Sequence, residues 1–172
     1  MKLEPAVAGD IEALHALIES AYRGDSARRG WTHEADLLGG QRTDAKALRA
    51  ILAADNQEIL VARRGQAITG CVQLTWLGDG LAYLGLLTVD PALQAAGLGK
   101  ELLSRSEAFV REQWQATAIE MTVIRQRTDL IAYYERRGYQ RTGEHRPFPH
   151  DDPRFGRPKT PELEFALLRK PI

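Results

Sequence analysis

The most informative part of the sequence is residues 89–100, VDPALQAAGLGK. This stretch follows an apolar run at residues 81–89 and precedes a long amphipathic segment, so it joins a strand to a helix. Gly97 and Gly99 have no side chains, so backbone N–H groups there can approach a ligand closely. Unpaired N–H groups and the dipole at the start of a helix favour an anion. The stretch predicts a phosphate-binding turn, although a glycine-rich turn that merely joins the two elements fits the same residues.

The segment after this turn predicts the best-defined helix of the chain, residues 97–115. Its apolar side chains fall within an arc of roughly 160°, and they are Leu98, Leu102, Leu103, Phe109, Val110 and Trp114. A helix of this kind packs on a sheet by one face only. A strand is expected next at residues 117–124, and then a short helix at residues 130–137 that ends at Gly138.

The rest of the chain alternates between helical and strand periodicity. Helices are expected at residues 8–22, 34–38 and 44–54. Further strands are expected at residues 58–63, 68–77, 140–144 and 162–168. Five of the eight prolines lie in residues 146–161, which predict a long ordered loop. This order predicts an α/β (α+β) mixed sheet in a single domain that spans residues 1–172.

The composition is that of an ordinary globular protein and narrows the function. Of the 172 residues, 44% are hydrophobic and 27% are charged, and no apolar run approaches the ~20 residues of a membrane span. The 23 basic residues balance the 23 acidic ones, which argues against a nucleic-acid partner. A single cysteine, Cys71, and no secretory leader favour a reducing, cytoplasmic location. We therefore expect neither a nucleic acid nor a membrane as partner.

Two well-known phosphate-binding motifs do not fit the glycine stretch. A P-loop needs Gly-Lys followed by Ser or Thr, and neither tripeptide occurs. A dinucleotide-binding fold needs three spaced glycines after its first strand. Here the glycines follow at least three expected strands, two of which are joined by a tight turn at residues 64–66.

Two segments resemble the GNAT superfamily of N-acetyltransferases. Residues 94–99, Gln-x-x-Gly-x-Gly, follow a strand that ends in LTVDP at residues 87–91, and they resemble the acyl-CoA loop of that family. Residues 130–139, LIAYYERRGY, are similar to its aromatic-Tyr-Glu-basic-x-Gly-aromatic signature. This second segment lies about 35 residues downstream of the loop, after one strand, as in the family. The start of the chain, with a helix after Gly9-Asp10, is also similar, so the resemblance covers most of the chain.

The resemblance implies a GNAT fold and an acyl-CoA site. The implied fold is a mostly antiparallel sheet with splayed central strands, flanked by helices. The implied cosubstrate is acetyl-CoA, without a metal. Tyr134 is expected beside the sulfur atom as the acid for the leaving thiolate. The other implied cofactor contacts are Leu87, Thr88, Val89, Gln94, Ala95, Ala96, Gly97, Leu98, Gly99 and Lys100.

The sequence departs from the family pattern at two positions. Many members have an Asn one turn before the aromatic helix, and that place is taken here by Arg127, which becomes the expected cofactor contact, with Asp129 as the alternative. Many members also have a Glu in the central strand as general base, and that place is taken by Gly85. Glu120, a charged residue in the next strand, is the candidate base. A solvent-facing position explains Glu120 equally well, and His145 or unassisted water are the other candidates.

The acceptor site is expected between the first helical connection and the proline-rich loop. The candidate acceptor-binding residues are Tyr22, Trp31, Glu34 and His145. Acidic residues at Glu34, Asp151 and Asp152 would suit a cationic amine. The histidines and carboxylates of the loop match no known metal-site spacing, so no metal is expected.

Two functions of different classes remain open. The first is an acetyl-CoA-dependent N-acetyltransferase, in which a primary amine of a small molecule or peptide attacks the thioester directly in a ternary complex. The second is a non-catalytic acyl-CoA-binding sensor or regulatory module, which the missing strand Glu at Gly85 favours and the retained Tyr134 disfavours. Members of the family often dimerise, so a homodimer is possible.

Overall fold

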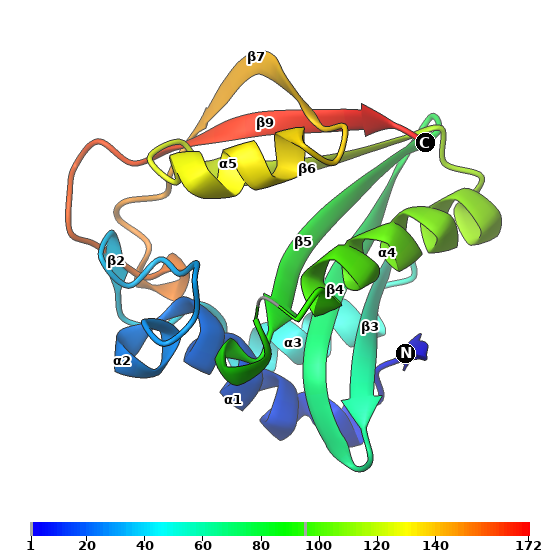
Figure 1. Cartoon of the computed structure of the whole chain (residues 1–172), viewed down its shortest axis with the longest axis horizontal. Coiled ribbons are helices and arrows are strands. Elements are labelled where there is room, and N and C mark those ends of the chain that lie inside the picture. Colours follow the sequence, from blue (N-terminus) through cyan, green and yellow to red (C-terminus); the bar gives the residue numbers. More distant parts are fainter. Residues whose placement is uncertain (1, 95) are drawn as a thin grey trace.

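The computed structural model describes residues 2–94 and 96–172, and it is built around a seven-stranded sheet (Figure 1). The strand order is β1-β3-β4-β5-β6-β9-β7, and only the β5–β6 pair is parallel among the pairs described. The strands of this sheet are β1 (Leu3–Pro5), β3 (Gln57–Arg64), β4 (Ala67–Gly78), β5 (Leu81–Val89), β6 (Ala118–Ile124), β7 (Gln140–Pro147) and β9 (Glu164–Pro171). The mixed sheet that the sequence pattern predicts is therefore confirmed, and so is the mostly antiparallel order that the resemblance implies.

Helices cover both faces of the sheet. The α-helices are α1 (Ile11–Tyr22), α2 (Gly24–Ala27), α3 (Ala45–Ala53), α4 (Leu98–Trp114) and α5 (Thr128–Glu135). Three 3-10 turns are η1 (Ala8–Asp10), η2 (Pro91–Leu93) and η3 (Pro153–Phe155). In Figure 1, α4 lies in front of β3, β4 and β5, and α3 lies behind them. None of the helices in the described residues is long and apolar enough to cross a bilayer.

Two buried clusters, one on each face, hold these layers together. Leu103 and Val110 of α4 and Ile131 of α5 pack with β-strand residues on one face. Leu14 of α1 and Leu48 of α3 pack with the strands on the other face. The apolar arc predicted for residues 97–115 is therefore the face of α4 that contacts the sheet.

The helix expected at residues 34–38 is not formed, and that prediction was wrong. The backbone carbonyl of Glu34 accepts hydrogen bonds from the N–H groups of Leu37 and Leu38, which makes a single turn. The chain then leaves helical geometry, because β2 (Leu38–Gly39) pairs antiparallel with β8 (Arg157–Pro158) in a separate two-stranded sheet. Part of the proline-rich loop is thereby tied to the segment that follows α2.

Candidate functional site

The two central strands separate and leave a wedge in the sheet. β5 and β6 pair only from Leu81 to Tyr83 on one side and from Ala118 to Glu120 on the other. Beyond Tyr83 the two strands diverge (Figure 1). A register shift in the β4–β5 ladder lies at the same place, and Leu86 has a φ of 48° there, which costs a non-glycine residue about 1 kcal/mol. The splayed central strands implied by the resemblance are therefore present.

The Leu87 carbonyl, in the diverging part of β5, accepts a hydrogen bond from the end of α1. The hydroxyl of Tyr22, at the end of α1, donates to the carbonyl oxygen of Leu87 at 2.7 Å. Burial raises the pKa of Tyr22, so this hydroxyl keeps its proton. The N-terminal helix is thereby joined to the strand that lines the wedge.

The glycine stretch forms the turn that starts α4. Gly97 is the residue before the helix and has a φ of +83°, a conformation that L side chains rarely adopt. The next N–H groups have no partner within the helix and carry the positive end of its dipole. Gly99 lies close to α5, because a Cβ there would be 3.3 Å from the hydroxyl of Tyr133. The turn can therefore hold an anionic group between α4 and α5.

Gln94 contributes an unsatisfied polar atom to this turn. Its amide nitrogen donates to the carbonyl of Val89 at 3.4 Å, whereas its Oε1 is buried and has no hydrogen-bond partner among the described residues. Gly30 faces the same side chain, and a Cβ at Gly30 would collide with it. A buried acceptor without a partner is costly. A donor on a bound molecule, such as a pantetheine amide, would satisfy it.

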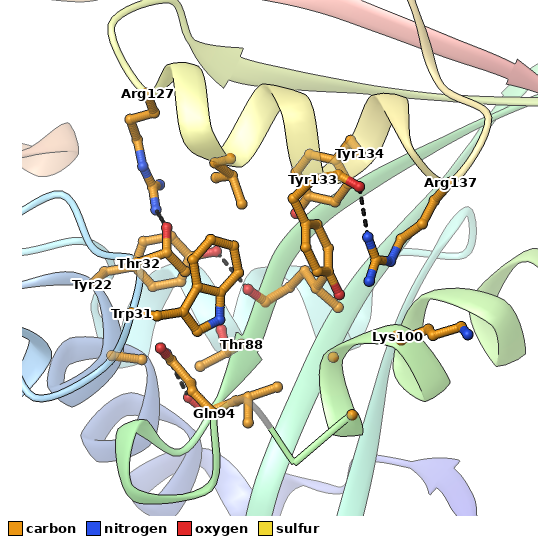
Figure 2. A pocket seen from close by; sticks show the side chains of 16 residues that line it. Tyr22, Trp31, Thr32, Thr88, Gln94, Lys100, Arg127, Tyr133, Tyr134 and Arg137 are labelled. Atoms are coloured by element: carbon orange, nitrogen blue, oxygen red, sulfur yellow. Dashed lines mark hydrogen bonds between the residues drawn. The ribbon is translucent and has the colours of Figure 1, made fainter.

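These elements enclose a first pocket of about 220 Å³ (Figure 2). It extends from the glycine turn along β5 to the face of α5. The predicted cofactor contacts that line it are Leu87, Thr88, Val89, Gln94, Gly97, Gly99, Lys100, Arg127 and Tyr134. Ala96 and Leu98 do not line it, and Ala95 lies outside the described residues. The lining residues that the sequence analysis did not assign to the cofactor are Ala21, Tyr22, Trp31, Thr32, Leu130, Tyr133 and Arg137.

Arg137 and Trp31 form the rim of the first pocket around Tyr133. The Arg137 guanidinium carbon lies 3.4 Å from the ring centre of Tyr133, and its Nη1 donates to the Tyr133 carbonyl at 2.7 Å. The Trp31 ring is 5.3 Å from that of Tyr133 and is 47% exposed. Trp31, an expected acceptor residue, therefore lines the first pocket together with the expected cofactor contacts. Arg137 was missed, because it stands at the unspecified position of the signature and Arg136 takes the basic one.

Tyr134 lies on α5 at the inner end of the first pocket. Its ring packs edge-on against Tyr133 and Tyr139, and 6% of the residue is exposed. Burial, assisted by the neighbouring Tyr22, raises the pKa of Tyr134 well above its ordinary value. Its hydroxyl makes no hydrogen bond to any described residue. It is therefore a protonated, unpartnered donor.

A second pocket, of about 260 Å³, begins where the first one ends. Five residues line both pockets: Tyr22, Leu87, Arg127, Leu130 and Tyr134. The other walls of the second pocket come from β5, β6 and the loop after β7. Their side chains are largely apolar and aromatic, with Phe148, Phe155 and Phe165 among them. Two molecules, one bound in each pocket, would meet at Tyr134.

Glu34 is at the centre of a buried ion cluster in the second pocket. Its Oε2 accepts from Arg23 at 2.9 Å, and its Oε1 accepts from Arg127 at 3.1 Å. Arg127 also donates to the hydroxyl of Thr32 at 2.7 Å. Burial alone would raise the pKa of Glu34, but Arg127, Arg42 and Arg23 outweigh it and hold the pKa below its usual range. Glu34 is therefore an ion-paired carboxylate.

Of the remaining acceptor candidates, Tyr22 lines the second pocket and His145 does not. His145 lies on β7, where its Nδ1 is 3.1 Å from Glu164, and it lines neither pocket. The acidic residues Asp151 and Asp152 line a shallow depression beside the loop instead.

A comparison of the sequence with protein families agrees with this geometry. The profile of the Acetyltransferase (GNAT) family matches residues 12–139, which include β5, the glycine turn and α5. The chain belongs to the GNAT acetyltransferase family. It is thus an N-acetyltransferase, and acetyl-CoA is the family's acetyl donor. No curated relative matches the sequence.

Solved structures share the fold of this GNAT acetyltransferase at low sequence identity. The ribosomal-protein-alanine N-acetyltransferase from Brucella melitensis has a TM-score of 0.72 and 16% identity, with 100% of both chains covered. A spermidine N-acetyltransferase variant from Vibrio cholerae has a TM-score of 0.68 and 13% identity, with 99% of this chain and 95% of that chain covered. A GNAT acetyltransferase from Elizabethkingia anophelis with acetyl-CoA bound has a TM-score of 0.60 and 17% identity, with 74% and 82% covered.

The structure of this GNAT acetyltransferase does not bring Glu120 to either pocket. Glu120 is 2% exposed, so the solvent-facing interpretation was wrong. Its Oε2 accepts from Arg169 of β9 at 2.8 Å, and its Oε1 is 3.6 Å from Arg146. Glu120 is not among the described residues that line the two pockets. Gly85, which takes the place of the strand Glu, does line the second pocket, beside the ring of Tyr83.

Proposed function

We propose that this chain transfers the acetyl group of acetyl-CoA to a primary amine by direct attack in a ternary complex. The observation that carries the proposal is that two pockets meet at Tyr134. The first pocket has the anion-binding turn and suits the cosubstrate. The second pocket opens on the other side of the wedge and suits the acceptor. Two molecules that enter from opposite sides need no covalent acetyl-enzyme.

The residues of the first pocket fit acetyl-CoA. The start of α4 offers unpaired N–H groups to a pyrophosphate. The diverging part of β5 is free of β6, so an extended pantetheine arm can pair with it as an added strand. The orphaned Oε1 of Gln94 and the cations Lys100 and Arg137 line the same path. The thioester would then lie beside Tyr134.

In the proposed reaction the neutral amine attacks the thioester carbonyl. A C–N bond forms, the C–S bond breaks, and the leaving group takes the electron pair as a thiolate. Tyr134 donates a hydrogen bond to this sulfur as charge develops. Full proton transfer to this thiolate from a tyrosine of ordinary pKa would be unfavourable by roughly 2 kcal/mol, because the tyrosine pKa is the higher of the two. Burial raises the pKa of Tyr134 and makes the transfer more unfavourable. A hydrogen bond that strengthens only in the transition state still accelerates the step.

The proton of the amine passes to water in this proposal. Gly85 has no side chain to accept it, and Glu120 is held by Arg169 outside the pockets. The rate should therefore rise with pH until the free amine is mostly neutral. Glu120 as general base is the alternative, and mutagenesis of Glu120 distinguishes the two.

The test is release of free thiol from acetyl-CoA in the presence of a panel of amines. Burial raises the pKa of Cys71, the only thiol of the chain, to about 12, so it does not interfere with the assay. Thiol release that depends on both substrates supports the transferase. Tight acetyl-CoA binding without turnover of any amine contradicts it and favours the acyl-CoA sensor.

A further inference from the structure

We propose that the acceptor of this enzyme is an amine that also carries a carboxylate and a large apolar group, as apolar α-amino acids do. The inference rests on the proposed function and specifies the second pocket. It starts from the charges that line that pocket.

Arg42 is the cation of the second pocket whose guanidinium has no hydrogen-bonding partner among the described residues, although its charge helps to lower the pKa of Glu34. It is half-buried, and its guanidinium carbon lies 5.1 Å from the ring centre of Tyr22. Its guanidinium makes no hydrogen bond or ion pair with any residue that the structure describes. Partial burial of a guanidinium whose N–H groups have no acceptor is unfavourable unless a partner arrives. An anionic group on the acceptor would be that partner.

Hydrogen bonds hold the backbone at Arg42 in place, so its side chain extends from a fixed position. The N–H groups of Arg42 and Thr43 both donate to Oε1 of Glu19, at 2.7 and 2.8 Å. Glu19 is on α1, the same helix that ends in Tyr22. The backbone from which Arg42 extends is therefore anchored to the helix whose last residue, Tyr22, also holds the carbonyl of Leu87.

The charge of the pocket lining does not cancel. The charged side chains that line it, among the described residues, are Arg23, Arg42, Arg127 and Glu34. Both oxygens of Glu34 are already occupied, one by Arg23 and one by Arg127. One carboxylate against three guanidinium groups leaves an excess of two positive charges. The pocket therefore repels a polyamine and attracts an anion, which revises the expectation that acidic residues there suit a cationic amine.

The rest of the pocket is suited to an apolar body. Met121, Val123 and Ile124 line it from β6, and Phe148, Phe155 and Phe165 line it from the C-terminal part of the chain. Phe155 is 45% exposed and stands at the solvent edge. An apolar side chain can bury against these groups while the carboxylate meets Arg42 and the amine points to Tyr134. A guanidinium binds a carboxylate through two parallel hydrogen bonds, which makes Arg42 a specificity residue.

The test compares phenylalanine with phenethylamine, a pair that differs only in the carboxylate. kcat/KM is measured over a range of pH and expressed per neutral amine, so that the different ionisation of the two amines is removed. We expect phenylalanine to be favoured by about 10- to 100-fold, the usual value of a hydrogen bond to a charged group. Arg42→Gln should reduce this ratio about 10- to 100-fold. Arg49→Gln, an exposed arginine on α3, is the matched control and should leave the ratio unchanged.

Binding of the products provides a second measurement that needs neither turnover nor a variant. N-acetylphenylalanine should bind the wild-type protein in the presence of CoA more tightly than N-acetylphenethylamine. Equal affinity, or a preference for phenethylamine or spermidine in turnover, would overturn the inference and leave the transferase intact. Failure of the transferase itself is recognised separately, as the absence of thiol release with every amine.

Discussion

The two pockets that meet at Tyr134 are built by different means. The first is made largely by backbone: a glycine turn, the start of α4 and the part of β5 that does not pair with β6. The second is made by side chains from distant parts of the chain, including a buried ion cluster around Glu34. A site of the first kind should fail when a Cβ or a charge is added. A site of the second kind should fail when one partner of an ion pair is removed.

The largest effect is expected at Gly97. Gly97→Asp adds a Cβ at a φ of +83° and a negative charge at the expected pyrophosphate position, so the affinity for CoA should fall by about 10³-fold or more. Calorimetry on the folded variant measures this. Gly65→Asp in the β3–β4 turn is the control, because Gly65 has a φ of +62°, a Cβ there would meet nothing within 4 Å, and it does not line the pocket. Unchanged CoA affinity in Gly97→Asp would remove the phosphate turn from the account.

The next largest effect is expected at Glu34. Glu34→Gln keeps the shape but leaves Arg23 and Arg127 without their carboxylate, which should cost about 3–5 kcal/mol of unfolding free energy. The pKa of Glu34 is lowered by folding, so its contribution is fully present above about pH 4.5 and is lost as the pH falls through its folded pKa. The stability gap between wild type and variant should therefore close in acid.

Denaturant unfolding at several pH values measures that gap. Glu12→Gln, an exposed carboxylate on α1, is the control and should change little. A gap that stays constant down to about pH 3 would mean that the buried carboxylate is not an ion-paired anion.

A smaller effect is expected at Glu120. Because Glu120 pairs with Arg169 and lines neither pocket, Glu120→Gln should cost about 1–3 kcal/mol of stability and leave the pH–rate profile unchanged. A general base would instead lose about 10²–10⁴ in rate. Glu112→Gln on the exposed side of α4 is the control. A rate loss of that size in a stable variant would restore Glu120 as the base.

The same difference explains what the sequence predicts well. The first pocket is formed mainly by residues 87–100 and 127–137. These two short segments have their own periodicity and turn residues, so most of the pocket lining could be predicted from the sequence. The glycine at position 97 indicates a positive φ, and the apolar arc predicts which side of α4 faces the sheet. Trp31 is an exception: the sequence suggests the acceptor site for it, and nothing local indicates that it packs on Tyr133.

The lining of the second pocket could not be predicted from the sequence in this way. Arg23, Glu34 and Arg127 have no common spacing in the sequence. Their ion pairs exist only in the folded protein, where Glu34 bridges the end of α1 and the start of α5. The helix expected at residues 34–38 failed for the same reason, since β2 is ordered by pairing with β8 near the far end of the sequence. The ion pair of Glu120 could not be foreseen either, because its partner Arg169 is on a strand that pairs with β6 only in the folded sheet.

The most direct test of the account is Tyr134→Phe, because Tyr134 lies where the two pockets meet. Tyr139→Phe is the matched control: its hydroxyl donates to Glu107 at 3.0 Å, and it lines neither pocket. We predict that Tyr134→Phe lowers kcat by about 10- to 10³-fold and leaves the Kd for acetyl-CoA nearly unchanged, whereas Tyr139→Phe keeps kcat. Normal turnover by Tyr134→Phe, or equal losses in the two variants, would contradict the account.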